Sequence, residues 1–257
     1  MRVVTIAIHT FKESVRQKVL YNLVAFALLL IGASILFGSI SVGVERIILI
    51  TLGLTSISVF GLLIAIFIGI DLVSKEIERR TIYNILSKPV TRVEFVLGKY
   101  LGLLLTLLVN TGIMTAGFYA ALYYQKRTLG PEDLVFLGAV YFILLQLAMV
   151  VGVALVFSCI STPVLSAVYT FCLFVIGNFS ADLRAFGQQT ENALLGTACG
   201  ALYYALPNFA NFNVISEVAH AQKIPGYLWV GNSLYALLYI TILLGLAILI
   251  FEEREFR

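Results

Sequence analysis

Six long stretches of apolar residues dominate the sequence and limit what the chain can fold into. A helix that crosses the hydrocarbon core of a bilayer needs about 20 mostly apolar residues, because no backbone polar group can be left unpaired there. The stretches cover residues 19–41, 47–70, 96–124, 134–160, 163–179 and 228–251. Hydrophobic residues make up 60% of the chain and charged residues only 12%, which is too few charges to cover a water-soluble protein of this size. We therefore expect an all-α integral membrane protein with six transmembrane helices in a single domain, 1–257.

The distribution of Lys and Arg predicts the orientation of these spans. If both termini lie in the cytoplasm, 12 of the 17 Lys and Arg residues fall on the cytoplasmic side and five fall outside. Cytoplasmic loops are the ones enriched in Lys and Arg. We therefore expect a multi-pass protein of the cytoplasmic (inner) membrane with both termini in the cytoplasm.

Residues 1–18 combine charged and apolar side chains ahead of the first span. Val4, Ile8, Phe11 and Val15 recur at helical spacing, while the charged residues fall on other faces. This pattern is typical of an interfacial helix that lies on the inner leaflet. The alternative is a cytoplasmic extension of the first span. The apolar stretch that follows is too long for a cleaved signal peptide.

The cytoplasmic loop 71–95, between the second and third spans, holds a large share of the charged residues. Charges of both signs stand close together at Lys75, Glu76, Glu78, Arg79 and Arg80. A loop that served only orientation or lipid head groups would be mainly basic. The mixture favours a protein partner, and the alternative is a solvated loop that only joins two spans.

The same loop has the pattern of a helix, a break and a second helix. Ile82, Ile85 and Leu86 share one face of a short helix, and Pro89 ends it because proline cannot continue a helix. Residues 91–94 then read T-x-x-E ahead of an apolar run. This is a capping box, which would begin the third span with its first amides bonded.

The stretch from Lys75 to Lys99 resembles the cytoplasmic signature of ABC-2-type permeases. In that family the signature reads approximately E-x-x-x-G-T, then a leucine-rich turn, then P-[VS]-S/T-R and G-K. This sequence has E-I-E-R-R-T from Glu76, L-S-K-P-V-T-R from Leu86, and then Gly98-Lys99, with Arg80 where many members carry Gly. The layout of six spans behind an amphipathic N-terminal helix is similar as well.

The resemblance implies that this loop is a coupling helix, which inserts into a groove of a separate ABC ATPase subunit. The docking residues that it implies are Lys75, Glu76, Glu78, Arg79, Arg80, Thr81, Ile82, Ile85, Leu86, Lys88, Pro89 and Arg92. A second, smaller contact would come from the turn between the fourth and fifth spans, at Ser158, Ser161, Thr162 and Pro163. Two permease subunits, as a homodimer or a heterodimer, would pair with two ATPase subunits.

The chain contains no G-x-x-x-x-G-K-[ST], the loop that cradles ATP phosphates. We therefore expect ATP and Mg to bind to the partner ATPase subunit, with no cofactor bound by this chain. No catalytic motif and no metal-ligand spacing of Cys and His occurs either, so we expect no enzyme activity and no metal site. The net charge of +3 is too small to indicate a nucleic-acid partner.

Ionisable residues are almost absent from the predicted spans. Their scarcity argues against an ion-coupled transporter and against a channel lined by rings of charge. The polar side chains at span depth that are candidates for lining a pathway are Asn110, Thr111, Gln146 and Tyr169. Hydrogen bonds between helices explain these residues equally well.

Small residues recur four positions apart within three of the spans. They are Gly61, Ala65 and Gly69 in the second span, Gly98 and Gly102 in the third, and Ala148 and Gly152 in the fourth. Such spacing lets helix backbones approach closely. Packing within one subunit and a dimer interface are both open, and packing within one subunit is favoured.

The outer loop, 180–227, is too long for a simple turn. Its middle, 191–206, is mostly apolar but short, which fits a re-entrant or surface-lying helix. The following residues 206–212 are similar to an L-P-N-x-x-x-F string of the permease subgroup linked to gliding motility and to maturation of nitrous-oxide reductase.

Together these features favour the permease subunit of an ABC exporter, which moves a substrate across the cytoplasmic membrane. The alternative is an ATPase-driven module that acts mechanically on an extracytoplasmic protein through the outer loop, without transport.

Overall fold

The computed structural model describes residues 2–41, 43–78, 91–190 and 193–253, and these residues form an all-helical bundle. The long helices are α2 (Lys18–Ile40), α3 (Glu45–Glu78), α5 (Arg92–Lys126), α6 (Val135–Ile160) and α11 (Gly226–Glu253). In this part of the chain, five helices are long and apolar enough to cross a membrane. The remaining predicted span, 163–179, forms α7 (Pro163–Asn178), which is apolar but has only 16 residues.

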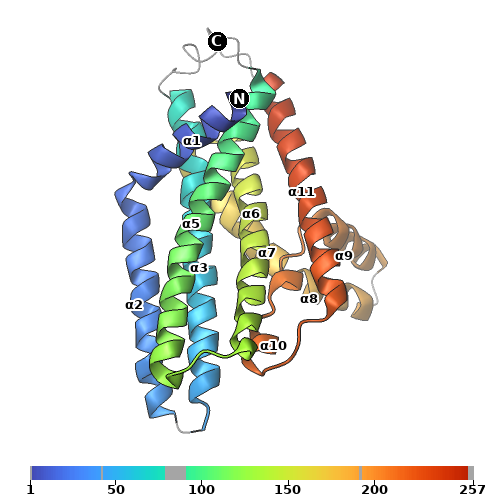
Figure 1. The fold of residues 1–257 in the computed structure, drawn as a ribbon. Coiled ribbons are helices and arrows are strands. Elements are labelled where there is room, and N and C mark those ends of the chain that lie inside the picture. The colour runs from blue at the N-terminus through green and yellow to red at the C-terminus, as the bar shows by residue number, and fades with distance from the viewer. Residues whose placement is uncertain (1, 42, 79–90, 191–192, 254–257) are drawn as a thin grey trace.

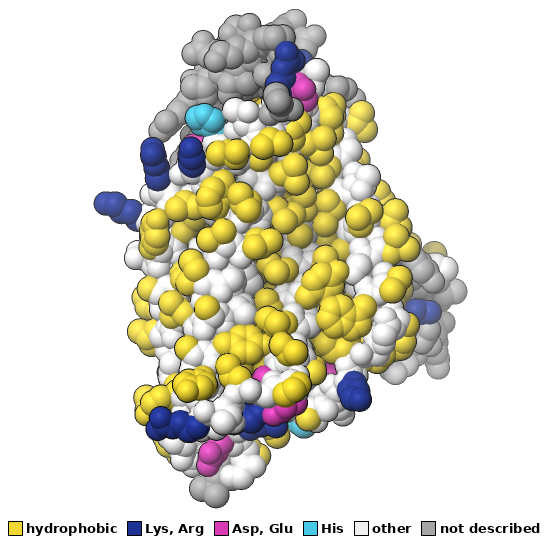
Figure 2. Space-filling view, viewed as in Figure 1, with side chains coloured by type: hydrophobic (Ala, Val, Ile, Leu, Met, Phe, Trp, Pro, Cys, Tyr) yellow, Lys and Arg dark blue, Asp and Glu magenta, His cyan; other side chains and the backbone are white. Residues whose placement is uncertain are grey.

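The shorter elements lie at the two ends of the bundle and beside it (Figure 1). They are α1 (Arg2–Val15), η1 (Pro131–Leu134), α8 (Ser180–Gln189), α9 (Ala193–Ala205), η2 (Ala210–Phe212) and α10 (Ile215–Ala219). We call the end that carries α1 the α1 end, and the opposite end the α10 end. Hydrophobic side chains cover the middle of the visible face, and charged side chains gather towards the two ends (Figure 2). A chain with this distribution suits a bilayer, because the apolar belt can face lipid tails.

Helix α6 forms the centre of the bundle, and most of its side chains are buried. Glycines on α3 bring the two backbones together. A Cβ atom on Gly69 would lie 2.6 Å from the Ala154 Cβ atom, and one on Gly61 would lie 2.5 Å from a methyl group of Leu147. These glycines therefore serve packing within one subunit, as the sequence analysis favoured, because van der Waals contact between helices needs small residues in lipid.

Helix α1 lies across the beginning of α5 and packs against two glycines (Figure 1). A Cβ atom on Gly102 would lie 2.6 Å from both the Ala7 carbonyl oxygen and the Thr10 Cβ atom. The glycines of α5 therefore make room for Ile6, Ala7 and Thr10 on the face of α1 that meets α5. The apolar residues Val4 and Ile8 remain exposed on another face. This exposed apolar face is the arrangement expected of a helix that also contacts lipid.

At the α10 end, a buried carboxylate joins three segments. Asp133 of η1 lies 3.1 Å from the Lys126 ammonium group and 3.9 Å from the Arg46 guanidinium group, and it also accepts a hydrogen bond from the Gly130 amide. Its side chain is almost fully buried. A buried carboxylate is stable only when paired in this way, so the cluster holds the beginning of α3 against the end of α5.

Candidate functional site

Helix α3 continues well beyond its apolar part at the α1 end. Its apolar part ends at Ile70, and the helix runs on to Glu78. At 1.5 Å per residue the whole helix is about 50 Å long, whereas the hydrocarbon core is about 30 Å thick. Lys75, Glu76 and Glu78 therefore lie on an extension of α3 that leads into the predicted coupling helix.

Most of the predicted docking residues lie outside the described residues. These are Arg79, Arg80, Thr81, Ile82, Ile85, Leu86, Lys88 and Pro89, so their role in docking stays a prediction.

The chain re-enters the bundle at α5 through the capping box that the sequence predicts. The Thr91 hydroxyl accepts a hydrogen bond from the Glu94 amide at 3.2 Å, and the Glu94 carboxylate accepts one from the Thr91 amide at 3.0 Å. This confirms the predicted capping box, and α5 begins at Arg92, before the apolar stretch expected to start at residue 96. Reciprocal bonds of this kind fix where a helix begins, because they satisfy amides that have no partner within the helix.

Arg92, the last of the predicted docking residues, has a contact within the chain. Its guanidinium group donates a hydrogen bond to the Phe251 carbonyl oxygen of α11 at 3.0 Å. The Phe95 and Phe251 rings stack beside it, with centroids 5.6 Å apart. The beginning of α5 and the end of α11 are therefore held together at the α1 end.

The Gly98-Lys99 pair of the signature also has a structural explanation. A Cβ atom on Gly98 would lie 2.7 Å from the Ile6 Cβ atom of α1, so the glycine makes room for α1. Lys99 is buried, and its ammonium group lies 5.6 Å from the centre of the Phe95 ring. Both residues thus belong to the packing of the α1 end.

The predicted second contact lies in the turn between α6 and α7. The Ser158 hydroxyl is buried and donates a hydrogen bond to the Leu155 carbonyl oxygen at 2.8 Å. Its hydroxyl hydrogen is therefore already bonded within α6. Ser161 and Thr162 follow as the residues between the two helices, with Thr162 exposed, and Pro163 begins α7. The Ser166 hydroxyl donates to the Phe157 carbonyl oxygen at 2.9 Å, which ties α7 to the end of α6.

Next to this turn lies an apolar pocket of about 370 Å³. Its lining residues are Gln17, Val19, Phe67, Ile70, Pro163, Val164 and Ala167. Pro163 therefore contributes to the wall of this pocket as well as to the turn.

Deeper in the bundle, residues 206–213 form a segment that is helical only at the short η2. Buried backbone that is not helical has no partners within its own segment, so other groups must satisfy its polar atoms. The Phe209 amide donates to the Gly177 carbonyl oxygen at 3.1 Å, and the Phe209 carbonyl oxygen accepts from the Gln146 side chain at 3.2 Å. Helices α7 and α6 thus hold the segment on one side.

Helix α11 holds the same segment on the other side. The Asn208 amide donates to the Tyr235 hydroxyl at 2.9 Å, and the Asn232 side chain donates to the Asn211 carbonyl oxygen at 2.7 Å. Phe209 is fully buried, and its ring lies 5.3 Å from that of Phe174. The segment is therefore a fixed part of the bundle core.

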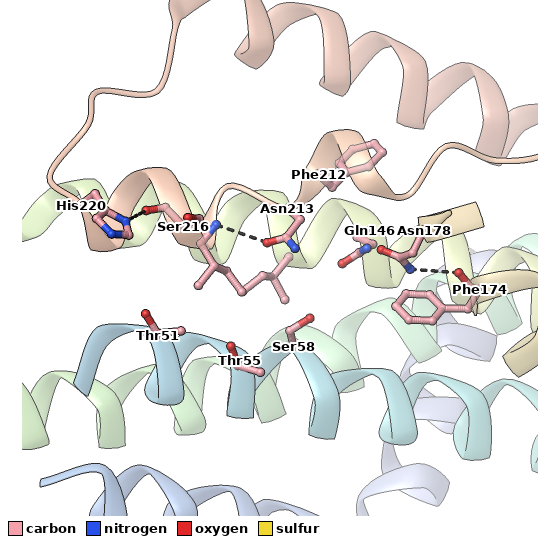
Figure 3. A pocket seen from close by; sticks show the side chains of 12 residues that line it. Thr51, Thr55, Ser58, Gln146, Phe174, Asn178, Phe212, Asn213, Ser216 and His220 are labelled. Atoms are coloured by element: carbon pink, nitrogen blue, oxygen red, sulfur yellow. Dashed lines mark hydrogen bonds between the residues drawn. The ribbon is translucent and has the colours of Figure 1, made fainter. Parts of the chain in front are cut away.

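A polar pocket of about 360 Å³ lies beside this segment. Its lining residues are Thr51, Thr55, Ser58, Ile143, Gln146, Phe174, Asn178, Phe212, Asn213, Ile215, Ser216 and His220. The three hydroxyl residues of α3 face the wall formed by Asn213, Ser216 and His220 (Figure 3). The lining contains no Lys, Arg, Asp or Glu. In the part of the chain that the structure describes, no group of three or more His, Cys, Asp or Glu side chains could hold a metal ion.

The structure brings only Gln146 of the predicted pathway residues into this pocket. Asn110 bonds to the Thr106 carbonyl oxygen of its own helix, and Thr111 is buried within the bundle. Tyr169 is exposed on α7 and packs against the Phe157 ring. None of these three residues lines the pocket.

The other polar residues of the pocket are not predicted from the sequence. The signal that could have found part of it is the spacing of Thr51, Thr55 and Ser58, which places three hydroxyls on one face of the second span. The residues between α9 and α11 carry no comparable periodicity.

Comparison with known protein families assigns the whole bundle. The model of the family described as "ABC-2 family transporter protein" matches residues 4–256, nearly the full chain. No curated protein matches the chain. Members of the family are typically non-catalytic membrane subunits that work with an ABC ATPase subunit. The chain is therefore a multi-pass membrane protein that belongs to the ABC-2 family of transporter proteins, as the membrane permease component of an ABC transporter.

Proposed function

We propose that this chain is the permease subunit of an ABC exporter in the inner membrane. Two permease subunits, identical or related, pair with two ATPase subunits. ATP and Mg bind to the ATPase subunits, and this chain binds no cofactor. The ATPases dock at the coupling loop 71–95 and, through a smaller contact, at the turn that contains Thr162.

The observation that carries this proposal is the continuity of α3. One unbroken helix contains both the pocket residues Thr51, Thr55 and Ser58 and the docking extension with Lys75 and Glu78. About 25 Å of helix separates Ser58 from Lys75 at 1.5 Å per residue. A displacement at the docking end is therefore transmitted to the pocket as a rigid-body shift, because a packed helix does not compress.

Helix α11 is the second element that the coupling loop moves. Arg92 follows the loop directly and bonds to Phe251, so a displacement of the beginning of α5 also acts on the end of α11. Helix α11 in turn bonds to the segment 206–213 through Tyr235 and Asn232. The two connections converge on the pocket from opposite sides.

The proposed topology has six crossings with both termini in the cytoplasm. The fifth crossing combines the short α7 with the segment 206–213. This segment bonds to Gly177 near the end of α7 and leads to α10. What supports this is the set of hydrogen bonds that satisfies the non-helical part of the crossing. The α1 end is then the cytoplasmic end.

A second candidate function is mechanical action on an extracytoplasmic protein without transport. The observation in its favour is the pair α8 and α9, two helices that pack against each other at the edge of the bundle (Figure 1). Its residues Phe186, Leu194 and Leu202 are exposed apolar side chains. The short similarity of residues 206–212 to the gliding-motility and nitrous-oxide-reductase subgroup points in the same direction.

A mild-detergent purification of the tagged chain, followed by mass spectrometry, tests the central proposal. We expect an ATPase with a Walker motif to co-purify. The double variant Glu78→Ala/Arg79→Ala should remain in the membrane but lose ATPase co-purification. The matched control is Glu217→Ala/Lys223→Ala, which removes a carboxylate and an ammonium group near the opposite end. A wild-type chain that purifies without any ATPase would contradict the proposal, as would equal co-purification by both double variants.

The two candidate functions differ in what happens when α9 is removed. Deletion of residues 191–206 should abolish export if the pair α8 and α9 belongs to the pathway. Retained export together with lost activity of an extracytoplasmic partner would favour the mechanical function.

A further inference from the structure

The polar pocket has hydrogen-bonding groups that the protein itself does not satisfy. Among the described residues, the hydroxyls of Thr51, Thr55 and Ser58 have no hydrogen-bond partner, although other hydroxyls in the spans bond to their own helix. All three face the pocket (Figure 3). Thr51 and Ser58 are half-buried and Thr55 is exposed, so a molecule that enters the pocket can reach all three hydroxyls. These hydroxyls are therefore available to bond to a ligand in place of water.

The amide side chains at the inner end of the pocket are oriented by bonds to the backbone. The Gln146 nitrogen donates to the Phe209 carbonyl oxygen at 3.2 Å, and the Asn178 nitrogen donates to the Phe174 carbonyl oxygen at 2.9 Å. Each amide then has its oxygen available as an acceptor. This end of the pocket is suited to hydroxyl groups that donate.

The histidine at the other end is also oriented. The His220 Nδ1 atom lies 2.8 Å from the Ser216 carbonyl oxygen, which can only accept. In the neutral ring Nδ1 therefore carries the proton, and Nε2 is an acceptor. The pocket thus combines acceptors at both ends with three hydroxyls that can rotate to donate or accept.

The lining also defines the charge of a ligand. It contains no Lys, Arg, Asp or Glu, so a charged ligand would find no partner of opposite charge among the described residues. An ionised group that gives up water for these neutral side chains gains no opposite charge in return, so the lining favours an uncharged ligand. The apolar residues Ile143, Phe174, Phe212 and Ile215 form the rest of the wall and suit the C–H face of a sugar ring. A volume of 360 Å³ falls in the range of about 300–1,000 Å³ that is usual for ligand pockets.

We propose that this pocket binds an uncharged polyhydroxylated group, either a free sugar or polyol or the sugar head group of a lipid. Binding is a property of this chain alone. That the ligand is the cargo of an exporter rests on the proposed function.

Two probes distinguish the two sources of such a group. The purified chain is placed in nanodiscs that contain phosphatidylcholine, phosphatidylglycerol and monoglucosyl diacylglycerol in equal amounts, and native mass spectrometry measures which lipid remains bound. Saturation-transfer NMR measures binding of free glucose to the chain in phosphatidylcholine nanodiscs. Neither assay contains an ATPase, so a failure of ATPase coupling would not change these results.

The informative variant is Thr51→Val/Thr55→Val, which removes two hydroxyls and keeps the shape of the side chains. We expect it to reduce binding of the glucosyl probe about tenfold, because two hydrogen bonds are lost. Ser216→Leu, which fills the pocket from the opposite wall, should do the same. The control is Thr241→Val on α11, an exposed threonine away from the pocket. Melting temperatures of all four chains establish that each is folded.

Retention of the glucosyl lipid without free-glucose binding assigns the site to a lipid head group, and binding of free glucose assigns it to soluble sugars as well. Both results support the proposal when the pocket variants weaken binding about tenfold and Thr241→Val does not. The proposal is overturned if neither probe binds, since water alone then fills the pocket. It is also overturned if the pocket variants bind as the wild type does, or if phosphatidylglycerol is retained more strongly than the glucosyl lipid.

Discussion

The guanidinium group of Arg92, at the first residue of α5, donates a hydrogen bond to the carbonyl oxygen of Phe251 near the end of α11 at 3.0 Å. These residues are far apart in the sequence, and the bond joins the helix that follows the coupling loop to the last helix of the bundle. The last carbonyl groups of a helix have no partner within it, so a cation placed there is favourable. The bond therefore stabilises the α1 end independently of any docking role of Arg92.

Replacing Arg92 by Ala should destabilise the isolated chain. A hydrogen bond to a charged group contributes about 1.5–3 kcal/mol, and its loss should lower the melting temperature of the detergent-solubilised protein. Arg16→Ala is the control, because Arg16 is exposed at the elbow between α1 and α2. Equal melting temperatures for Arg92→Ala and wild type would show that the bond to Phe251 contributes nothing to stability.

Replacing Gly102 by Val should separate α1 from α5. Even a Cβ atom at this position would lie 2.6 Å from the Ala7 carbonyl oxygen, and overpacking of this kind typically costs about 1–3 kcal/mol. The readout is the reactivity of a cysteine placed at the buried Thr10, which should rise in the variant. Gly112→Val on the same helix is the control, because nothing lies within 4 Å of a Cβ atom there. A Thr10→Cys label that reacts equally in both variants would contradict the close packing of α1.

Replacing Gly177 by Ala should displace the segment 206–213. A Cβ atom on Gly177 would clash with the Pro207 carbonyl oxygen and would lie 2.5 Å from the Phe209 ring. The backbone of the segment cannot retreat without breaking its bonds to Gln146 and Tyr235. We expect a lower melting temperature and faster hydrogen exchange at the Phe209 amide. Gly245→Ala, on the lipid-facing α11, has open space around its Cβ position and should leave both quantities unchanged.

Impermeant thiol reagents test the proposed orientation. In a background with the exposed Cys172 replaced by Ala, a cysteine at Thr162 should react only from the cytoplasm. A cysteine at Gln222, an exposed residue that follows α10, should react from the outside. The expectation follows from the excess of Lys and Arg on the side that holds the α1 end. Reaction of Thr162→Cys from the outside would reverse the topology.

Much of the bundle could be predicted from the sequence because its signals are local. Runs of apolar residues mark helices that need a bilayer, and five of the six predicted stretches form helices long enough to cross one. Thr91 and Glu94 form the predicted capping box because the donors and acceptors of such a box stand three residues apart. The helix expected at residues 1–18 is present as α1, again from side chains at helical spacing.

The face of α1 that packs is less obvious from its sequence. The apolar residues Val4 and Ile8 stay exposed, whereas the buried Thr10 lies on the face that meets Gly102. Helix association in lipid depends on close approach of the backbones. Moving an apolar side chain from lipid tails to a helix interface gains little, because both surroundings are apolar. Hydrophobic periodicity therefore does not identify the packing face.

The polar pocket separates what the sequence by itself determined from what only the tertiary structure decided. Composition and apolar periodicity determined that the chain is a helical membrane protein, and the charged loop between the second and third spans indicated its family. The convergence of Thr55 from α3, Gln146 from α6 and His220 from beyond α10 was decided by how the segment 206–213 is held by hydrogen bonds from α6, α7 and α11. Those bonds join residues distant in sequence, and their donors and acceptors carry no local pattern, so only the folded chain brings them together.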